Sequence, residues 1–491
     1  MNLAALVEPH PAAASAFLAD GQATSYGALR RRAAGLRGAL VAAGVAPGDR
    51  VALISGNAPA FVVGLLGILG AGAAAVPLNP QAPPAELHRE LDAVGASAAI
   101  LGPGVVRPPE SRLALVLAAD PAEGATALAA AEAADPAPLV DRQAGDVAVL
   151  MFTSGTAGLP RAAVLTHGNV LANIAQVQAH PGRLVMPSDV TLGVLPLFHV
   201  FGLTITLCLP LAAGGSVVLV PRFDPAEALD LCERHGVTLL AGAPPMFAAL
   251  AAAPAHDGAN PLASVRLAVC GAAPLPDQVA ADVRTRFGVP LYQGYGLTEA
   301  SPVVTSSVID GDPRPGSVGV PVPGVEVRLV DEEGDDALTG DPGEVWVRGA
   351  NVFAGYWQDP EATDRVLTAD GWLRTGDLGV VGDDGNLQLV DRAKDLIIVN
   401  GFNVVPAEVE AVLLQHPFIS DVAVVGEPSP RTGEAVKAVI VPAPGTTPTL
   451  SELAAYAAER LARYKCPTAL LVVDDIPRGQ AGKLLRRRVR E

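Results

Sequence analysis

Positive charge is in short supply along this chain. The 34 Lys and Arg residues face 51 Asp and Glu residues, which leaves a formal net charge of −17. Nucleic acids and anionic membranes attract basic surfaces, so this balance argues against nonspecific binding to either. We therefore expect no nucleic-acid partner, and we expect any polyanionic small ligand to be held by a few local cations.

Cysteine is also scarce, with four residues at positions 208, 232, 270 and 466. None of them forms a Cys-x-x-Cys pair, which argues against a disulfide framework and against a cysteine metal site. Isolated cysteines in a large acidic chain suit a reducing compartment. Residues 1–11 lack a basic stretch followed by an apolar core, so we expect no signal peptide and a cytoplasmic location.

A long uninterrupted apolar segment is missing as well. Residues 57–81 form an uncharged stretch that is broken repeatedly by glycine and proline, which argues against a transmembrane segment. The run predicts instead a buried helix over residues 60–69 and a short strand that ends at residue 76. Hydrophobic residues make up 50% of the chain and charged residues 17%, so we expect a folded globular protein.

The order of apolar and amphipathic segments predicts the fold class. Residues 51–54 and 98–101 are expected to be strands and residues 84–94 a helix, and this alternation is typical of an α/β protein with parallel sheets. Residues 118–138, rich in Ala, Pro, Asp and Glu, are expected to form a surface excursion. A chain of 491 residues is long enough for two or more domains.

A domain boundary is predicted near residues 392–395. The pattern beyond it suits a small α+β domain of about 100 residues. Its expected elements are strands over residues 396–399, 421–425, 435–441 and 469–473 and helices over residues 406–415 and 451–463. We therefore expect a large N-terminal α/β domain, residues 1–391, and a small C-terminal domain, residues 396–491.

A loop rich in hydroxyl groups and glycine lies between residues 147–152 and 162–165, two apolar runs that are expected to be strands. The loop contains Thr153, Ser154, Gly155, Thr156, Gly158 and Arg161. Glycine lets backbone N–H groups approach phosphate oxygens, hydroxyls donate hydrogen bonds, and a guanidinium neutralises charge. The loop predicts a polyphosphate site, with a polar surface turn as the alternative. It is not a Walker loop, because no Gly-Lys-Ser/Thr follows at the required spacing.

Further motifs follow the loop in a fixed order. They are Gly271-Ala272-Ala273-Pro274-Leu275, Gln293-Gly294-Tyr295-Gly296-Leu297-Thr298-Glu299, Trp372-Leu373-Arg374-Thr375-Gly376-Asp377, Asp391-Arg392-Ala393-Lys394-Asp395 and Gly479-Gln480-Ala481-Gly482-Lys483. Each motif is weak alone, but their joint occurrence in this order is specific. The chain thereby resembles, over nearly its whole length, the adenylate-forming superfamily of acyl- and aryl-CoA synthetases, adenylation domains and luciferases. It is most similar to the fatty-acid and coumarate-type CoA ligases.

The resemblance implies an ATP-dependent acid–thiol ligase that uses ATP, Mg²⁺ and CoA. A carboxylate attacks the α-phosphorus of ATP, which yields an acyl-AMP and pyrophosphate, and the thiol of CoA then attacks the acyl carbon. In this family a small mobile C-terminal domain rotates between the two steps. The resemblance therefore places the ATP- and acyl-binding site in residues 1–391 and a hinge in residues 392–395, with Lys394 as the hinge residue and an ordinary linker lysine as the alternative.

The resemblance also assigns nucleotide-binding residues. Glu299 would bind Mg²⁺, which takes oxygen ligands, and Thr298 would donate a hydrogen bond to the α-phosphate. Asp377 can accept hydrogen bonds from both ribose hydroxyls, and Arg392 would reach the sugar or a phosphate. Tyr295 would offer a flat face to the adenine. The base would be framed by residues with little bulk, namely Gln293, Gly294, Gly271, Ala272 and Ala273.

Lys483 is implied as the residue that bridges the substrate carboxylate and the α-phosphate. A mobile point cation suits a site where charge shifts between oxygens during the attack, and a solvated lysine in a basic tail is the alternative. After the domain rotation, Gly401 and Phe402 would face the CoA arm, because glycine permits its close approach.

The acyl pocket is implied near His199, which lies in an apolar segment, with a satisfied core histidine as the alternative. The other pocket residues would be Val200, Phe201, Pro302 and Val303. The His199 segment contains no acidic residue to pair with an amino group, and residues 301–310 contain no arginine to pair with a second carboxylate. An apolar monocarboxylate is therefore expected, with a fatty acid first and an aryl acid second.

The chain departs from the family pattern in its phosphate loop. Ala157 stands where a hydroxyl is usual, and Arg161-Ala162 stands where Lys-Gly is usual. One alternative is therefore a nucleotide-binding protein with weakened catalysis. Another is an acyl-AMP ligase that loads an acyl carrier protein, but the insertion typical of such ligases is not found. Activity is expected, because Thr298, Glu299, Asp377, Arg392 and Lys483 are all present. The resemblance implies catalytic roles for Lys483, Thr298, Glu299 and His199.

Overall fold

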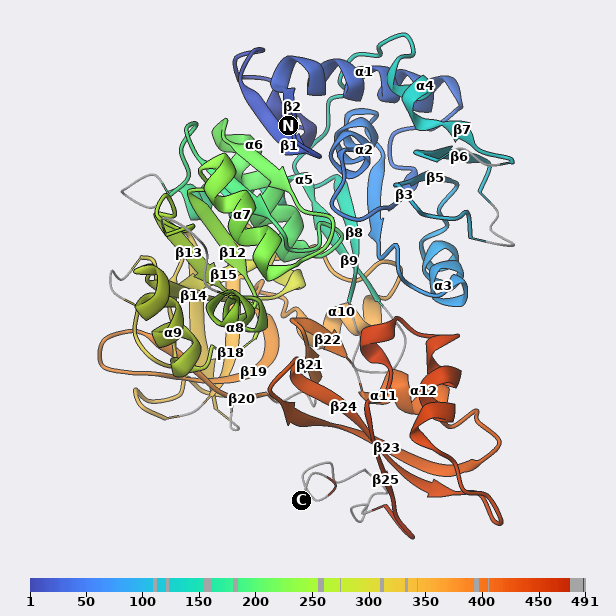
Figure 1. The fold of residues 1–491 in the computed structure, drawn as a ribbon, viewed down its shortest axis with the longest axis vertical. Helices are drawn as coiled ribbons and strands as arrows, with labels where there is room; N and C mark the ends of the chain where they lie inside the picture. Colours follow the sequence, from blue (N-terminus) through green and yellow to red (C-terminus); the bar gives the residue numbers. More distant parts are fainter. Residues whose placement is uncertain are drawn as a thin grey trace. The chain divides into compact units, whose positions relative to one another are not determined.

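The chain divides into two compact units in the computed structural model (Figure 1), which describes residues 1–108, 113–120, 123–153, 161–179, 184–254, 260–273, 275–309, 313–331, 334–341, 343–392, 397–404, 406–476 and 489. The first unit comprises Met1–Pro80, Leu91–Met151 and Ala162–Asp391. The second comprises Gln81–Glu90, Phe152–Arg161 and Arg392–Glu491.

A seven-stranded sheet has the order β7-β6-β5-β3-β4-β8-β9. Its strands are β3 (Arg50–Ile54), β4 (Ala74–Leu78), β5 (Ala98–Leu101), β6 (Leu115–Ala118), β7 (Thr126–Ala127), β8 (Val147–Thr153) and β9 (Arg161–Thr166). The pairs from β7 to β8 are parallel. Its helices are α1 (Tyr26–Ala42), α2 (Pro59–Gly70), α3 (Pro84–Val94), α4 (Leu128–Glu132) and α5 (His167–Gln178). Because parallel strands need crossover connections, this sheet alternates with helices as the sequence predicts.

A thirteen-stranded sheet has the order β17-β18-β19-β20-β16-β15-β14-β13-β12-β10-β11-β1-β2. Its strands are β1 (Ser15–Ala19), β2 (Gln22–Ser25), β10 (Val190–Gly193), β11 (Ser216–Leu219), β12 (Leu239–Gly242), β13 (Leu267–Cys270), β14 (Leu291–Gly296), β15 (Val303–Ser306), β16 (Ser317–Pro321), β17 (Val325–Val330), β18 (Gly343–Gly349), β19 (Leu373–Val381) and β20 (Leu387–Arg392). The run from β1 through β11, β10, β12 and β13 to β14 is parallel. From β14 onward the described pairs are antiparallel.

The remaining helices of the first unit are short. They are η1 (Leu3–Val7), η2 (Gly202–Cys208), α6 (Leu209–Ala213), α7 (Pro225–His235), α8 (Pro244–Ala252), α9 (Asp277–Phe287), η3 (Thr298–Ala300) and α10 (Pro360–Val366). The element η2 is a π-helix, a rare conformation that occurs often at functional sites. Gly202 opens it where a Cβ would lie 2.1 Å from the carbonyl oxygen of Pro196, so only glycine fits there.

The second unit is built on a five-stranded sheet, in which β22-β21-β24-β23 are ordered and β25 pairs with β24. Its elements are β21 (Ile397–Val399), β22 (Phe402–Val404), α11 (Pro406–Leu413), β23 (Ile419–Ser429), β24 (Gly433–Pro442), α12 (Leu450–Ala458), η4 (Arg463–Lys465) and β25 (Ala469–Val472). Pairing is antiparallel except between β24 and β25. This arrangement confirms the predicted fold class, which combines large α/β sheets with a small C-terminal α+β part.

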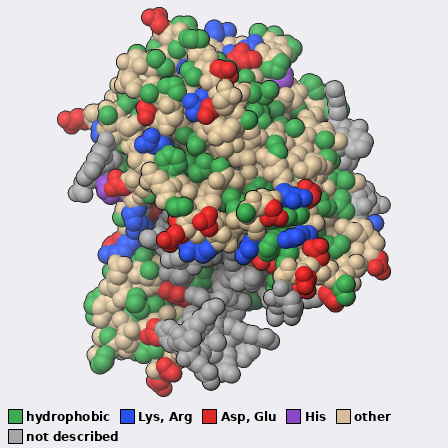
Figure 2. Space-filling model, turned by 180° about the vertical axis from the view of Figure 1, so that it is seen from behind, with side chains coloured by type: hydrophobic (Ala, Val, Ile, Leu, Met, Phe, Trp, Pro, Cys, Tyr) green, Lys and Arg blue, Asp and Glu red, His purple; other side chains and the backbone are tan. Residues whose placement is uncertain are grey.

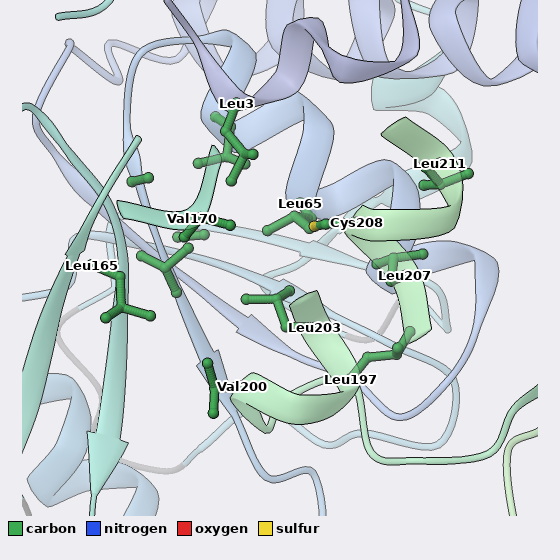
Figure 3. Packing of buried hydrophobic residues seen from close by; sticks show 14 of the residues in the cluster. Leu3, Leu65, Leu165, Val170, Leu197, Val200, Leu203, Leu207, Cys208 and Leu211 are labelled. Carbon is green, nitrogen blue, oxygen red and sulfur yellow. The ribbon is translucent and has the colours of Figure 1, made fainter. Parts of the chain in front are cut away.

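The largest core of the first unit gathers side chains from elements far apart in the sequence (Figure 3). Leu3 of η1, Leu65 of α2, Leu165 of β9, Val170 of α5 and Leu203 of η2 are each at most 1% exposed. Fully burying one such side chain contributes about 1.5–3 kcal/mol. The apolar runs of the sequence are therefore what joins the two large sheets.

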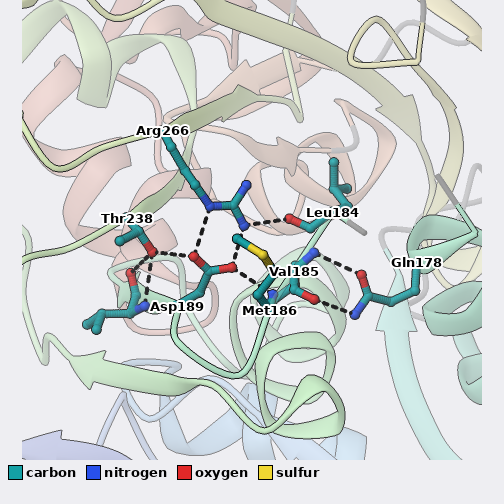
Figure 4. A network of polar contacts seen from close by, with 8 residues as sticks. Gln178, Leu184, Val185, Met186, Asp189, Thr238 and Arg266 are labelled. Carbon is teal, nitrogen blue, oxygen red and sulfur yellow. Dashed lines mark hydrogen bonds and ion pairs between the residues drawn. The ribbon is translucent and has the colours of Figure 1, made fainter. Parts of the chain in front are cut away.

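A buried ion pair fastens the starts of three parallel strands (Figure 4). Asp189, which is 2% exposed, accepts hydrogen bonds from the Thr238 hydroxyl at 2.8 Å and from Arg266 Nε at 2.9 Å. Although burial opposes it, the hydrogen bond from Arg266 and that from the Met186 backbone N–H lower the pKa of Asp189. These residues precede β10, β12 and β13, so the network fixes the edge of the sheet where those strands begin.

Charged groups are buried in the second unit. Lys465 donates from Nζ to Glu86 at 2.8 Å and to Glu408 at 3.0 Å, and each of the three side chains is at most 6% exposed. Glu90 is 8% exposed. Burial and the neighbouring charge of Glu86 raise the pKa of Glu90 to about 8.

The four cysteines, Cys208, Cys232, Cys270 and Cys466, are free and buried.

The observed elements follow the sequence expectations closely. The helices predicted over residues 60–69 and 84–94 are α2 and α3, and the strands predicted over residues 51–54 and 98–101 are β3 and β5. The strand expected to end at residue 76 extends to Leu78, and residues 118–138 are more than a surface excursion, because they contain α4 with Leu128 buried. The helix expected over residues 451–463 ends earlier, as α12 at Ala458, and strand β22 is not expected from the sequence.

Surface character agrees with the composition. On the face drawn in Figure 2, acidic and basic side chains lie interspersed. Within the described ranges, every helix is too short or too polar to cross a bilayer.

Candidate active site

The predicted site residues gather at one edge of the thirteen-stranded sheet. β10, β12, β13 and β14 run parallel, so the segments that follow them leave the sheet at the same edge. The segments after β10, β13 and β14 carry His199, Gly271 and Thr298 in turn. In open α/β sheets, ligands bind outside the carboxyl ends of the strands. The topology therefore brings together residues that are spread over a hundred positions of sequence.

Tyr295 and Asp377 form a direct contact. The Tyr295 hydroxyl on β14 donates a 2.7 Å hydrogen bond to Oδ2 of Asp377 on β19. Tyr295 is 8% exposed and Asp377 is half-buried, so the carboxylate is the more open of the two groups. The backbone N–H of Asp377 donates to the Thr375 hydroxyl at 3.1 Å. The sequence predicts both residues at the nucleotide, but it does not predict that they hold each other.

The residues predicted around the base lie on β14 and directly after β13. The N–H of Gly271 donates to the carbonyl of Gly242 at 3.1 Å, which continues the ladder beyond β13. Ala272 has a φ of 68°, which is uncommon for a residue with a Cβ, and Ala273 is half-buried. Gln293 exchanges hydrogen bonds with Ser307, and Gly294 pairs with Ser306 of β15.

Glu299 and Thr298 lie in the short helix η3, where both are half-buried. Oε1 of Glu299 accepts a 2.7 Å hydrogen bond from the hydroxyl of Tyr356. The carbonyl of Glu299 accepts another from the N–H of Phe353 at 2.8 Å. Glu299 is therefore fixed through its side chain and its backbone by one segment, residues 353–356.

Several predicted residues fall at or beyond the limits of the described chain. Ser154, Gly155, Thr156, Gly158, Lys394 and Lys483 lie outside the described residues, as does the side chain of Arg392. The two ends of the phosphate loop are described: the Thr153 hydroxyl donates to the carbonyl of Arg161 at 3.4 Å. That bond closes the base of the loop between β8 and β9.

The residues predicted for the acyl pocket separate into two groups. Phe201 lies against Gly271, where an added Cβ would be 3.2 Å from two of its ring carbons. Val200, by contrast, is 2% exposed and belongs to the hydrophobic core (Figure 3). Pro302 is buried and Val303 is half-buried at the start of β15, and the Ser301–Pro302 peptide bond is cis. Phe201 and Val303 are thus the more accessible candidates.

Gly401 and Phe402 are the residues predicted to face CoA, and both lie in the second unit. Gly401 has a φ of 82°, which favours glycine. The ring of Phe402 stacks on that of Tyr464, with 4.4 Å between centroids and 22° between planes. The tight turn at Gly401 thus leads directly into the half-buried ring of Phe402 at the start of β22.

Buried asparagines support the site, although the site motifs of the sequence do not include them. Asn57 donates to the carbonyls of Gly193 and Leu195 and accepts from Leu197 N–H, which fixes the approach to His199. Asn173 exchanges two hydrogen bonds with Val303, and Asn351 donates to the carbonyl of Ala300. An isolated asparagine usually signals a turn, so no local pattern marks these three as supports.

Mg²⁺ does not require a cage made of protein ligands alone, so the single carboxylate of Glu299 is a suitable ligand for it. Within the described parts of the chain, no group of three or more His, Cys, Asp or Glu side chains could hold a metal ion. Mg²⁺ is usually held by one or two carboxylates together with substrate phosphates and water. The single carboxylate of Glu299 is compatible with that pattern.

Two histidines are held neutral. Burial lowers the pKa of half-buried His199 to about 4. His167, which is 0% exposed, accepts a hydrogen bond at Nδ1 from the N–H of Leu3. Burial and the charge of Arg142 lower the pKa of His167 from its ordinary value of 6.5 to about 4. Both imidazoles are therefore uncharged near neutral pH.

The neutral state of His167 predicts a loss of stability in mild acid. As the pH falls, the unfolded chain takes up the His167 proton near pH 6.5, whereas the folded chain takes it up only near pH 4. We expect this residue alone to lower the free energy of unfolding by roughly 2 kcal/mol from about pH 7 to about pH 5. Urea unfolding at both pH values measures it. His167→Asn keeps an acceptor for Leu3 and should remove this part of the pH dependence; an unchanged dependence would contradict the prediction.

Comparison with known proteins identifies the family of this chain. A family model described as AMP-binding enzyme matches residues 4–357, and one described as AMP-binding enzyme C-terminal domain matches residues 408–483. A feruloyl-CoA synthase from an Amycolatopsis species is 41% identical over 502 residues, which cover 99% of this chain and 96% of that protein.

Two further relatives extend the comparison. A long-chain-fatty-acid–CoA ligase from Escherichia coli O157:H7 is 35% identical over 97% of this chain and 91% of its own length. The solved structure of the amide bond synthetase McbA from Marinactinospora thermotolerans matches with a TM-score of 0.89 at 34% identity, covering 100% of this chain and 99% of that one. The chain therefore belongs to the AMP-binding enzymes of the adenylate-forming superfamily, and it is an ATP-dependent, AMP-forming acid–CoA ligase.

Proposed function

We propose that the acid is an aryl monocarboxylate of the cinnamate type and that the product is its CoA thioester. The observation that carries this proposal is the half-buried ring of Phe201, which lies against Gly271 and would form an aromatic wall there. A planar substrate ring gains from an offset or edge-on contact with such a wall. The feruloyl-CoA synthase, more similar in sequence than the fatty-acid ligase reported above, supports the same choice. The fatty acid expected from sequence thus becomes the second candidate.

A fatty acid keeps support from two observations. The predicted pocket residues Val303 and Phe201 are apolar, and the long-chain ligase from Escherichia coli is similar over nearly the full chain. An alkyl chain is recognised mainly by burial of apolar surface, which these residues also offer. Selectivity between an aryl acid and a fatty acid is therefore expected to depend on the aromatic contact rather than on charge.

The proposed roles follow the two-step reaction. Asp377 would hold the ribose, and Glu299 would hold Mg²⁺ on the phosphates, where the metal neutralises charge that develops at the α-phosphate. Thr298 and Arg161 would contact phosphate oxygens, and Lys483 would hold the attacking carboxylate beside the α-phosphorus. The neutral His199 would shape the pocket without adding a charge beside the carboxylate. Water must be kept from the acyl-AMP until the CoA thiol attacks.

An acid panel tests the proposal. The purified protein would receive ATP, Mg²⁺, CoA and an equimolar mixture of cinnamate-type, fatty, dicarboxylic and amino acids, and mass spectrometry would identify the products. We expect an aryl-CoA thioester to dominate. A dominant fatty acyl-CoA would support the second candidate instead. Acyl-AMP without thioester would point to a carrier protein or an amine as acceptor, and no product from any acid would contradict the proposal.

Replacing Phe201 with leucine should lower the selectivity for aryl acids. An aromatic pair contributes about 0.5–1.5 kcal/mol beyond burial, so the ratio of kcat/KM for aryl over fatty acids should fall by about threefold to tenfold. Phe223→Leu is the matched control, because Phe223 is also half-buried but packs against another core cluster. An unchanged ratio in Phe201→Leu would show that the ring of Phe201 does not select aryl acids.

A further inference from the structure

Glu299 is bound by a segment that no sequence motif assigns to the site. The Tyr356 hydroxyl donates to Oε1 of Glu299 at 2.7 Å, and the Phe353 N–H donates to the Glu299 carbonyl at 2.8 Å. All three residues belong to the first unit. The carboxylate thus has one oxygen, Oε1, engaged by a neutral donor from outside its own helix.

The same segment is joined to the strand that follows the phosphate loop. Ala354 N–H donates to the carbonyl of Val164, Val164 N–H donates to that of Gly355, and Trp357 N–H donates to that of Ala162, at 2.8–3.0 Å. Ala163 and Tyr356 form an antiparallel bridge. Residues 353–357 therefore act as a short added strand on β9, which begins where the loop ends.

The ring of Tyr356 is itself held in place. It packs edge-on against Phe353, with 5.0 Å between centroids and 76° between planes. The Tyr356 N–H donates to the Thr363 hydroxyl at 2.9 Å, and that hydroxyl donates to the carbonyl of Asp359, the N-cap of α10. A phenol fixed by β9, by Phe353 and by α10 has little freedom to follow a moving carboxylate.

We propose that Tyr356 is the positioning residue of Glu299, which holds Oε1 so that Oε2 is presented to the cation on the ATP phosphates. The inference rests on the proposed role of Glu299 in holding Mg²⁺. Groups that hydrogen-bond a metal-ligating carboxylate orient it, and their loss commonly lowers metal affinity or activity by about 10–100-fold. Residues 353–357 contact both Glu299 and β9, and β9 begins at the end of the phosphate loop. The position of this carboxylate therefore depends on the position of β9.

The test is the affinity of the site for Mn²⁺, a spectroscopic substitute for Mg²⁺. Binding would be followed by electron paramagnetic resonance in the presence of α,β-methylene ATP, so that no turnover is needed. In Tyr356→Phe, which keeps the ring packing, we expect Mn²⁺ affinity to fall by about tenfold. We also expect the Mg²⁺ concentration for half-maximal adenylation to rise by a similar factor, while KM for the acid stays unchanged.

A second tyrosine supplies the matched control. Tyr26 is 0% exposed, and its hydroxyl donates to the carbonyls of Leu211 and Gly215, remote in sequence from the site motifs. Tyr26→Phe also loses a buried phenol, so it should lower the unfolding temperature and leave Mn²⁺ affinity as in the wild type. If Tyr26→Phe lowered Mn²⁺ affinity as much as Tyr356→Phe does, the effect would be one of general stability and the inference would be wrong.

Glu299→Gln separates the inference from the proposed function. If Glu299→Gln loses Mn²⁺ binding and Tyr356→Phe does not differ from wild type, then Glu299 holds the metal but Tyr356 does not position it, and the inference fails alone. If Glu299→Gln binds Mn²⁺ like the wild type, the metal role of Glu299 in the proposed function fails, and the inference fails with it.

Discussion

Replacing Asp377 with alanine is expected to lower the affinity for ATP by at least about 100-fold. A carboxylate that accepts hydrogen bonds from both ribose hydroxyls contributes about 1.5–3 kcal/mol for each bond, and every 1.4 kcal/mol is a factor of ten in affinity. The Tyr295 hydroxyl donates to Oδ2 of the half-buried Asp377 carboxylate and thereby restricts the orientation of this group. Calorimetric titration of the enzyme with ATP measures the loss directly.

The ribose contact can be isolated by changing the ligand as well. Wild-type enzyme should bind 2′-deoxy-ATP more weakly than ATP, whereas Asp377→Ala should bind the two alike. Tyr295→Phe keeps the carboxylate and removes only the bond that orients it, so its loss should be smaller, about tenfold. Equal discrimination between the two nucleotides by wild type and Asp377→Ala would show that this carboxylate does not read the ribose.

Replacing Lys465 with methionine is expected to lower the free energy of unfolding by about 3–5 kcal/mol. The change leaves Glu86 and Glu408, each at most 6% exposed, without the cation that Nζ supplies at 2.8 and 3.0 Å. Burial opposes it, but Tyr464, Glu408 and Glu86 together hold the pKa of Lys465 above its ordinary value, so this side chain is charged in the folded protein. Chemical denaturation monitored by circular dichroism gives the difference.

Neutralising the carboxylates is the control for the Lys465 prediction. The triple variant Lys465→Met, Glu86→Gln and Glu408→Gln removes all three charges and should recover much of the lost stability.

The variant Glu90→Gln tests the cost of burying a carboxylate near the same cluster. Because burial raises the pKa of Glu90 to about 8, its protonated form stabilises the fold at low pH and that contribution is lost as the pH rises from 4.5 to 8. Glu90→Gln should therefore be more stable than wild type above pH 8; equal stability there would contradict the burial argument.

The fold was largely predictable because local patterns dictate it. The apolar run of β8, the amphipathic helix α3 and the glycine- and proline-broken run containing α2 each carry their own signal, and the family motifs fix their order. Comparison confirms the superfamily and the CoA ligase activity, while the individual site roles stay predictions. What local patterns could not indicate is the antiparallel continuation of the large sheet beyond β14, which depends on long-range pairing.

The supports of the site were harder to predict for the same reason. Tyr356 lies 57 positions from Glu299 in sequence, and nothing around either residue indicates that a hydrogen bond joins them. Asn351 donates to Ala300 across 51 positions. The core placement of Val200 was equally hidden, since a valine beside a pocket and one in the core look alike in a sequence. Contacts that close only when distant strands pair have no local signature.

The four buried thiols give the protein an unreactive background for covalent labelling. Burial raises the pKa of Cys208 and Cys232 to about 12 and that of Cys466 to about 11, and it raises the pKa of Cys270 as well. Since the thiolate is the reactive form, maleimides and disulfide reagents should leave the native enzyme almost unmodified. A single cysteine introduced on each side of residues 392–395 would then carry the only two fluorophores, and the distance between them could be followed through one catalytic cycle.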